Sequence, residues 1–268
     1  MMRSLALLVA AFLLLGSGVG GALEVRAGLD HSEWTRLLHK YVDDRGLVDY
    51  GAWKRSPDRE ALRSYLAALG AGPRPAAEGN AKAASLINAY NALTIAWVMD
   101  NYPMPSIRSL SGSFATRRHR VGGETVSLDD LEHRTLRPLV GYRVHAALVC
   151  AARSCPPLAR EAYVAERLDA QLDTAMRRWL AREDLNRVDP ITGEAHLSSI
   201  FKWFAEDFES VGGPLAVLRR YGPPRADLEA SHLSVRYLPY DWTLNDRAGR
   251  PDSYGGLRRL WDAIKDAF

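Results

Sequence analysis

The segment Ala81–Met99 constrains the fold most, because it is the most apolar helix candidate inside the chain. It reads A-K-A-A-S-L-I-N-A-Y-N-A-L-T-I-A-W-V-M and is apolar on nearly every face, which predicts a helix buried at the centre of the protein. Asn88 and Asn91 stand three residues apart and therefore share one face of this helix. Pro103 and Pro105 end the helical segment.

The rest of the chain mixes helical and extended segments without a regular alternation. Apolar spacing predicts helices at 33–42, 58–69, 128–137, 161–182, 199–208, 214–221 and 257–267, with Ser127 capping the third and Pro138 stopping it. Extended segments are expected as hairpins at 120–126 and 187–197 and as strands at 144–149 and 235–238. With 47% hydrophobic residues the chain can bury one sizeable core. The fold class is therefore α+β, a helix-rich single domain around a small mixed or antiparallel sheet.

The N-terminus has the three parts of a secretory signal peptide. Arg3 gives a positive start, an apolar stretch S-L-A-L-L-V-A-A-F-L-L-L follows, and small residues lead to Ala22. We expect residues 1–22 to be removed, which leaves 23–268 as a single domain that is periplasmic or secreted. A retained anchor is the alternative, although the apolar run is short for a membrane span. No later segment is apolar enough to cross a membrane, and an oxidising compartment would permit a disulfide.

Charge argues against a nucleic-acid partner. The formal net charge is +3, and the strongest basic run, R-R-H-R at 117–120, has no interleaved aromatic residues. We expect the partner to be a small-molecule or peptide substrate, and we expect no cofactor and no metal.

Arg143–Pro157, which reads R-V-H-A-A-L-V-C-A-A-R-S-C-P-P, contains both cysteines of the chain. A nucleophilic Cys150 needs a neighbouring base or positive charge. His145 is five residues away, and on a regular strand the two side chains point to opposite faces. His133 lies late in the helix that leads into this strand, so it is the better partner.

A histidine that activates a thiol must itself be oriented by an acid or an amide. The candidates stand in apolar or aromatic surroundings: Asn88, Asn91, Asp241 and Asn245. A structural role is the alternative, because buried amides must be hydrogen-bonded and brace neighbouring loops, and an aspartate commonly caps a turn.

Acidic residues elsewhere are expected to serve the fold. Glu132 is predicted to form a structural ion pair with Arg137 or Arg143. The motif K-W-F-A-E-D-F, which contains Asp207, indicates a core stripe with solvated acids, and we assign it no chemistry.

Two further states of the cysteines stay open. Four residues separate Cys150 from Cys155, so a disulfide can close a small loop and would prevent Cys150 from acting as a nucleophile. The two cysteines with His133 and His145 could also form a tetrahedral zinc site, although the C-x₄-C spacing is at the wide end for zinc ligands.

Four ordered motifs, spread over roughly Trp34 to Asn245, resemble a family of bacterial and plant proteins of unknown function, DUF547. They read I-N-A-Y-N-A-L-T-I, S-L-D-D-L-E-H-R-T-L-R-P, R-V-H-A-A-L-V-C-A-A-R-S-C-P-P-L and Y-D-W-T-L-N. Family members usually carry Phe-Trp before the first motif, where this chain has Leu86-Ile87. The resemblance implies export for many bacterial members and implies little about mechanism. Plant members generally lack the second cysteine, which points to Cys150 as the position of broader use.

The sequence therefore predicts an exported cysteine-dependent hydrolase or acyl transferase that acts on amide or peptide bonds. The alternative is a non-catalytic binding or structural domain with a Cys150–Cys155 disulfide. The candidate catalytic residues are Cys150, His133, His145, Asn88 and Asp241. The candidate substrate-binding residues are Asn91, Arg143, Glu132 and Asn245.

Overall fold

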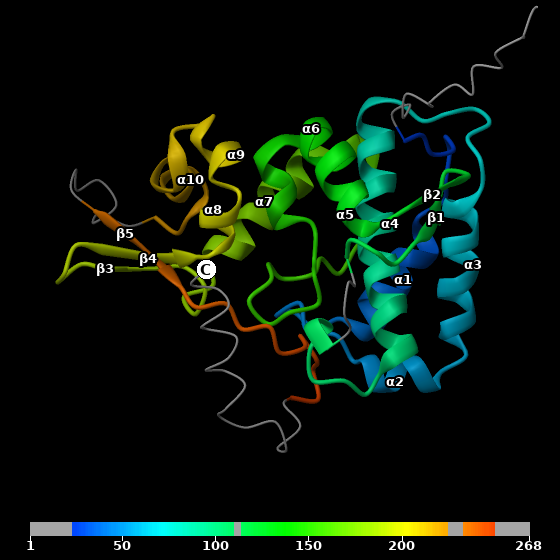
Figure 1. The fold of residues 1–268 in the computed structure, drawn as a ribbon, viewed down its shortest axis with the longest axis horizontal. Helices are drawn as coiled ribbons and strands as arrows, with labels where there is room; N and C mark the ends of the chain where they lie inside the picture. The colour runs from blue at the N-terminus through cyan, green and yellow to red at the C-terminus, as the bar shows by residue number, and fades with distance from the viewer. Residues whose placement is uncertain (1–22, 110–113, 225–232, 250–268) are drawn as a thin grey trace, which may run out of the picture.

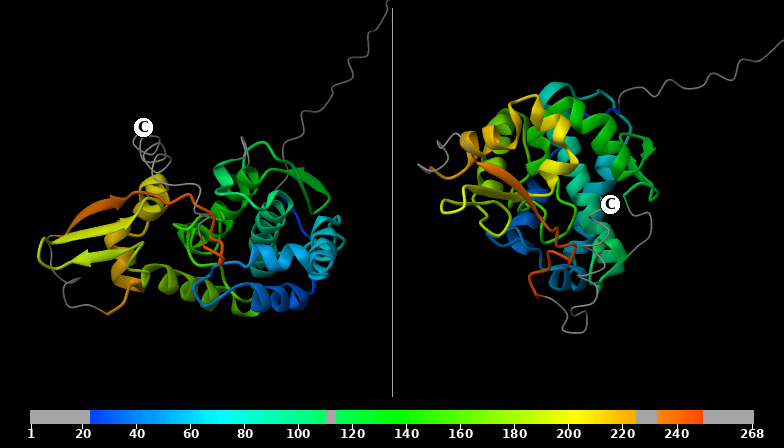
Figure 2. Two further views of the ribbon diagram at one scale, coloured as in Figure 1. Left: turned by 90° about the horizontal axis from the view of Figure 1, so that it is seen from below. Right: turned by 60° about the vertical axis from the view of Figure 1, so that its left-hand side comes forward.

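The computed structural model describes residues 23–109, 114–224 and 233–249, so the expected leader at 1–22 and the expected helix at 257–267 lie outside the described residues. Figure 1 shows helices α1–α4 gathered at one end of the molecule and strands β3–β5 with helices α8–α10 at the other. Helix α7, Leu168–Leu180, extends between the two groups (Figure 2). Buried hydrophobic residues from Leu23 to Leu244 form one core cluster that runs through both groups.

The first half of the chain is helical. Its elements are α1 (Ser32–Tyr41), α2 (Tyr50–Arg55), α3 (Asp58–Gly70), α4 (Gly79–Asn101) and the short 3₁₀ helix η1 (Ile107–Ser109). Helix α4 is buried on all sides from Ala83 to Ile95, as its apolar sequence predicts. Helix α2 was not expected from the sequence; Asp49 caps it by accepting a hydrogen bond from the backbone of Ala52 at 2.9 Å.

A hairpin and a continuous helical rod follow α4. Strands β1 (His119–Val121) and β2 (Glu124–Val126) pair antiparallel around Gly122-Gly123, which confirms the predicted hairpin. The rod consists of α5 (Leu128–Asp130), a π-helical turn η2 (Leu131–Leu136) and α6 (Arg137–Val140). Ser127 begins it with a complete capping box shared with Asp130, as predicted. The expected stop at Pro138 is wrong, because the helix continues past this proline to Val140, with Pro138 in the first turn of α6 directly after the π-helical turn.

The second half holds the shorter elements. They are η3 (Gly141–Ala146), η4 (Ala165–Arg167), β3 (Arg187–Asp189), β4 (Glu194–Ser198), α8 (Ile200–Trp203), α9 (Ala205–Glu209), α10 (Gly213–Tyr221) and β5 (Ser234–Leu238). Strand β4 pairs antiparallel with β3 and parallel with β5, so this sheet is mixed. The helix-rich α+β prediction is confirmed, with two small sheets in place of one.

Two predicted elements differ from the structure. The expected strand at 144–149 is wrong: the chain forms the 3₁₀ helix η3 and then a turn. The expected long helix at 161–182 is shorter, because residues before Ala165 run without helical structure and α7 begins only at Leu168. Of the helices in the described part of the chain, none combines the length and apolar character that a bilayer-spanning segment needs.

Candidate functional site

A cavity of about 260 Å³ brings together five of the residues that the sequence singled out. We call it the cysteine pocket. Its lining comprises Tyr90, Phe114, Asp129, Glu132, His133, His145, Leu148, Cys150, Cys155, Pro156, Ile200, Trp203, Phe204, Tyr240 and Trp242. The π-helical turn supplies Glu132 and His133, and η3 supplies His145. The described lining residues come from six separate stretches of the chain, which meet at this one cavity.

Cys150 and Cys155 form a disulfide, with 1.96 Å between the sulfur atoms. The expected disulfide alternative is confirmed, and in this state neither sulfur is a thiolate nucleophile. The zinc alternative is wrong for the same reason, because a zinc site needs two thiolates. Among the residues that the structure describes, no group of three or more His, Cys, Asp or Glu side chains is arranged to hold a metal ion.

The two sulfur atoms have different surroundings. Cys150 is half-buried, whereas Cys155 is only 4% exposed. The backbone N–H of Cys150 donates to Sγ of Cys155 at 3.1 Å. The hydroxyl of Tyr240 lies 3.2 Å from each sulfur. The sulfur of the buried Cys155 thus has two hydrogen-bond donors within reach, and the sulfur of the half-buried Cys150 has one.

The backbone beside Cys150 is strained. Ala151 has φ of 62° and is the only non-glycine residue with positive φ in the described part of the chain. Such a left-handed conformation costs an alanine on the order of 1–2 kcal/mol. Its carbonyl accepts a hydrogen bond from the backbone N–H of Asn245 at 2.9 Å, which helps to hold this conformation. Strained backbone of this kind clusters at functional sites.

The motif Y-D-W-T-L-N runs along the disulfide loop and fastens it. The backbone N–H of Arg153 donates to the carbonyl of Thr243 at 2.8 Å, and that of Ser154 donates to the carbonyl of Asp241 at 3.2 Å. The N–H of Asp241 in turn donates to Oγ of Ser154 at 2.8 Å. The last motif therefore sets the position of the cysteine loop through its backbone.

The side chains of Asp241 and Asn245 make hydrogen bonds that stabilise the fold around this motif. Oδ1 of Asp241 accepts from the N–H of Thr243 at 3.0 Å and from its hydroxyl at 2.6 Å, which caps the turn as the structural alternative predicts. Oδ1 of the buried Asn245 accepts from the hydroxyl of Tyr50 at 2.7 Å. Neither residue lines the cysteine pocket.

Asn88 and Asn91 brace the two flanks of the loop. Asn91 donates to the carbonyl of Ala147 at 2.9 Å and accepts from the N–H of Val149 at 2.9 Å. Asn88 makes the corresponding pair of bonds with the carbonyl and the N–H of Tyr163, at 2.8 and 2.9 Å. Both amides are buried, so these contacts satisfy backbone groups that water does not reach. Both asparagines therefore make the backbone contacts that a structural role predicts.

Glu132 pairs with neither arginine, so the predicted ion pair is wrong. Its Oε2 accepts a hydrogen bond from the hydroxyl of the buried Tyr90 at 3.0 Å. Burial raises the pKa of the Glu132 carboxyl, and this outweighs the lowering by His133, Tyr90 and Arg137. Arg143 lies outside the cysteine pocket and pairs with Asp169 at 2.6 Å and Asp173 at 3.0 Å.

Asp207 joins the two histidines of the pocket into one network, a role that we did not predict. Oδ2 of Asp207 lies 2.6 Å from Nε2 of His145. Arg137 donates to both oxygens of Asp207, at 2.8 and 2.9 Å, and donates to Nδ1 of His133 at 2.9 Å. Because arginine has only donors, the last contact requires an unprotonated Nδ1 on His133.

Burial and this hydrogen-bond network determine the charge states of His145 and Asp207. Burial lowers the pKa of His145 to about 4, and the hydrogen bond to Asp207 offsets this only in part. At neutral pH the imidazole is therefore neutral and donates Nε2–H to the carboxylate. Arg137 is the main cause of the lowered pKa of Asp207, with His145 as a smaller one.

The order of the two histidines predicted from strand parity rests on a wrong premise. His145 lies on a 3₁₀ helix, so opposite-face alternation does not apply, and it lines the same pocket as Cys150. His133 also lines the pocket but is more exposed, and both rings pack against Phe204, with centroids 4.1 Å away for His145 and 6.0 Å for His133.

Aromatic rings form the wall beside the sulfurs. The centroid of the Tyr240 ring is 4.7 Å from that of Trp203 and 4.5 Å from that of Trp242. Trp203 is 39% exposed, so this wall reaches the surface. Among the described residues that line the pocket, the carboxyl groups are those of Asp129 and Glu132, and none is lysine or arginine.

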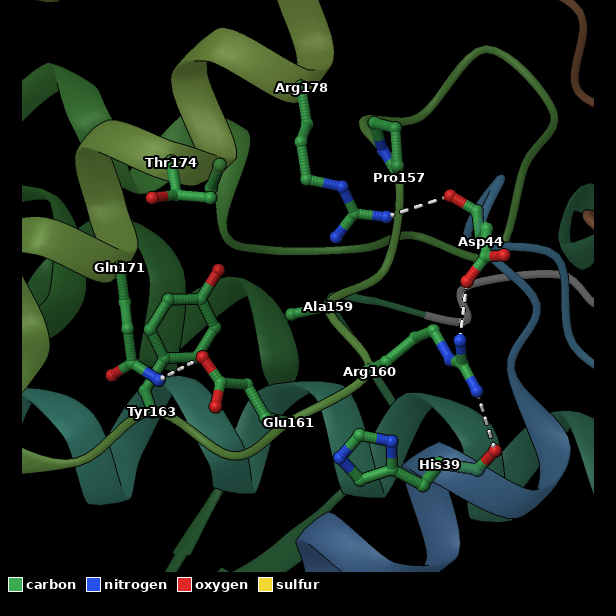
Figure 3. A pocket seen from close by; sticks show the side chains of 11 residues that line it. His39, Asp44, Pro157, Ala159, Arg160, Glu161, Tyr163, Gln171, Thr174 and Arg178 are labelled. Atoms are coloured by element: carbon green, nitrogen blue, oxygen red, sulfur yellow. Dashed lines mark hydrogen bonds and ion pairs between the residues drawn. The ribbon is translucent and has the colours of Figure 1, made fainter.

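A second cavity, of about 420 Å³, is lined in part by residues 157–161, which follow the disulfide loop. Figure 3 shows it, and its lining is His39, Asp44, Pro157, Ala159, Arg160, Glu161, Tyr163, Gln171, Thr174, Ala175 and Arg178. Arg160 pairs with the carboxylate of Asp44, and Arg178 donates to its backbone carbonyl at 3.1 Å. Glu161 accepts from Gln171 at 3.1 Å. None of the site residues predicted from the sequence lines this cavity.

Comparisons with known proteins agree with the motifs. A search of curated proteins and a search of solved structures each gave no match. One family model, described as "Protein of unknown function, DUF547", matches residues 76–180. The matched segment contains Asn88, Asn91, His133, His145 and both cysteines, and it ends before Asp207. Residues 76–180 are thus similar to the DUF547 family, which confirms the resemblance over this part of the chain.

Proposed function

We propose that this protein is a cysteine-dependent hydrolase or acyl transferase that acts on amide or peptide bonds once its disulfide is reduced. The observation that carries the proposal is the shared pocket of Cys150 and His145, with His145 held by Asp207 at 2.6 Å. A thiol, a histidine and a carboxylate that orients the histidine form the constellation of thiol hydrolases.

Each member of this set has a role. Asp207 accepts the hydrogen bond from Nε2–H of His145 and so fixes the ring and its tautomer. Nδ1 of the neutral imidazole is then the nitrogen that can take the proton of the Cys150 thiol. Arg137 positions Asp207 through two hydrogen bonds. Glu132, His133 and the aromatic wall contact the substrate.

The reaction follows from these roles. A dithiol reductant first supplies two electrons and two protons to the disulfide and is itself oxidised to a disulfide. The Cys150 thiol then passes its proton to His145, and the sulfur attacks the carbonyl carbon of the amide. The C–N bond breaks, and the amine leaves with the proton from His145. Water or an acceptor amine then attacks the thioester, gives a proton to His145, and releases Cys150 as the thiol.

The same proposal includes export, with removal of residues 1–22. A disulfide is favoured in oxidising compartments such as the periplasm, which supports this location. Cell fractionation followed by sequencing of the mature N-terminus tests it. An intact N-terminus on protein found in the cytoplasm would contradict this part of the proposal.

The decisive test of the chemistry uses two matched variants. Cys155→Ser leaves Cys150 as a permanent thiol, whereas Cys150→Ser leaves Cys155 as one. With a panel of amide and peptide substrates, we expect turnover by Cys155→Ser without any reductant and by wild type only after reduction. Cys150→Ser should be inactive under both conditions, since a serine hydroxyl replaces the nucleophilic thiol. Equal turnover by the two variants would remove Cys150 from the mechanism.

The second candidate is a non-catalytic binding domain. It is favoured by the disulfide and by the amides Asn88 and Asn91, whose polar atoms all bond the backbone. In that case Cys155→Ser turns over no substrate, and its Cys150 reacts with an alkylating reagent no faster than the same thiol in an unfolded peptide.

A further inference from the structure

We infer that the cysteine pocket is also a directional thiol–disulfide exchange site, in which a small thiol attacks Sγ of Cys150 and Cys155 is the leaving sulfur. This activity needs no amide substrate, and it rests on the proposed function only in giving the released Cys150 thiol a use.

Access favours attack on Cys150. Both cysteines line the cavity, but Cys150 is half-buried, whereas Cys155 is only 4% exposed. Exchange proceeds by attack of a thiolate on one sulfur of the disulfide, and access helps decide which sulfur is attacked. A thiol that enters the pocket therefore meets Cys150 first.

Hydrogen bonding favours departure of Cys155. Negative charge develops on the leaving sulfur, and charge-assisted hydrogen bonds stabilise it. The backbone N–H of Cys150, at 3.1 Å, contacts Cys155 and so serves only this direction of cleavage. The hydroxyl of Tyr240 lies 3.2 Å from Cys155 as well, and ring contacts with Trp203 and Trp242 hold it there.

The exchange balances in two steps. The thiolate RS⁻ attacks Sγ of Cys150, the Cys150–Cys155 bond breaks, and its electron pair moves to Sγ of Cys155. The product is a mixed disulfide between R and Cys150. A second thiolate attacks the sulfur of R, which releases Cys150 as a thiolate and forms RSSR. Two thiols have then been oxidised, and the protein disulfide has been reduced by two electrons.

The lining also selects the charge of the thiol. Among the described residues of the lining, Asp129 and Glu132 are the acidic ones and none is lysine or arginine, and aromatic faces, which attract cations, line the same cavity. Arg108 and Arg137 approach the rings of Trp242 and Phe204 from outside the lining, at 4.8 and 5.1 Å, and Arg137 is paired with Asp207. A thiol that carries an ammonium group should thus react faster than one that carries a carboxylate.

The direction can be read from the position of the trapped adduct. Oxidised wild-type protein is exposed briefly to cysteamine, free thiols are blocked by alkylation, and peptides are mapped by mass spectrometry. We expect cysteamine on Cys150 and the alkyl group on Cys155 in at least a roughly tenfold excess over the reverse arrangement, which corresponds to about 1.4 kcal/mol. An unfolded peptide with the sequence V-C-A-A-R-S-C-P should give both adducts. An equal split in the folded protein, or cysteamine mainly on Cys155, would overturn the inference.

Tyr240→Phe tests the donor without removing the ring. We expect exchange to slow several-fold while the adduct stays on Cys150, because the backbone N–H remains. Tyr237→Phe is the matched control, since Tyr237 is exposed on the nearby β5. Equal slowing in both variants, or no slowing in Tyr240→Phe, would exclude the hydroxyl from the exchange.

A charge series tests the class of thiol. Rates with cysteamine, 2-mercaptoethanol and mercaptoacetate are each divided by the rate of the same thiol with the peptide disulfide. We expect this ratio to fall from the cation to the anion, and to fall less steeply in Asp129→Asn than in the control Asp169→Asn. A flat or reversed series contradicts the selectivity. Because no amide is present, this result does not depend on hydrolysis, which Cys155→Ser tests separately.

Discussion

Nε2 of His145 lies 2.6 Å from Oδ2 of Asp207, a residue 62 positions further along the chain. This contact joins η3 to α9 beside the disulfide, and it turns a buried histidine into an oriented one. His145 lines the same cavity as Cys150, whereas Asp207 contacts the imidazole from outside the lining.

Stability should fall on mild acidification because His145 is buried as a neutral ring. Its pKa in the folded protein is about 4, below the ordinary 6.5, so the unfolded state binds the proton more tightly. This contribution is fully present above pH 6.5 and is lost as the pH falls toward 4, by about 3 kcal/mol at most. Urea unfolding at a series of pH values measures it.

His145→Gln is the control for this titration. The variant is expected to be less stable at neutral pH, and its stability should change less than that of the wild type between neutral pH and pH 4. The dependence that remains includes a contribution from His119, whose pKa burial also lowers to about 4. His196→Gln, which alters a half-buried histidine on β4, should keep the wild-type dependence. A wild-type dependence in His145→Gln would contradict the assignment.

Asn91→Ala should destabilise the fold by about 3 kcal/mol. The substitution leaves the carbonyl of Ala147 and the N–H of Val149 buried without partners, and each such group costs on the order of 1–3 kcal/mol. Asn80→Ala, at an exposed position on the same helix, should cost little. Urea unfolding compares them, and equal losses would deny Asn91 its bracing role.

The sequence was sufficient to predict elements with strong local signals. The apolar run of α4, the capping box at Ser127 and the glycine pair of the first hairpin each depend on neighbouring residues alone. The shared face of Asn88 and Asn91 follows from helical spacing, and so does their burial. The sequence therefore predicts that these two amides are hydrogen-bonded and brace neighbouring loops.

The features that were missed depend on tertiary contacts. The short apolar run at 144–149 does not distinguish a strand from a buried turn, because both bury it completely. Asp207 resembles any solvated acid in sequence, and only packing brings it to His145 and Arg137. One local signal existed: Asp207 stands between Phe204 and Phe208, two rings that contact His145.

Ala151→Gly should leave the stability of the fold unchanged or increase it, whereas Ala152→Gly should lower it. Glycine adopts a φ of 62° without the steric cost that alanine meets, although it increases the entropy of the unfolded chain. Ala152→Gly loses an equally buried methyl group with no strain to relieve, and should cost about 1 kcal/mol. Thermal unfolding that ranks Ala151→Gly below Ala152→Gly would contradict the strain at Ala151.

Gly122→Ala should be costly, because both its conformation and its surroundings require glycine. A Cβ at this residue would lie 1.6 Å from the carbonyl oxygen of Glu24, and φ is +59°. We expect a loss of about 3 kcal/mol. Gly193→Ala is the control: its φ is +67° and a Cβ meets nothing within 4 Å, so only the backbone cost of about 1 kcal/mol remains. Equal losses in urea unfolding would contradict the close approach of Glu24.

The most direct test of the account is the rate at which iodoacetamide alkylates Cys150 in Cys155→Ser, with and without His145→Gln. The account predicts that the folded single variant reacts at least roughly tenfold faster near neutral pH than the same thiol in an unfolded peptide, because a histidine base faces the thiol. The double variant should return to the peptide rate, whereas adding His196→Gln should change nothing. A peptide-like rate in Cys155→Ser, or a fast rate that survives His145→Gln, would contradict the claim that the pocket pairs Cys150 with His145.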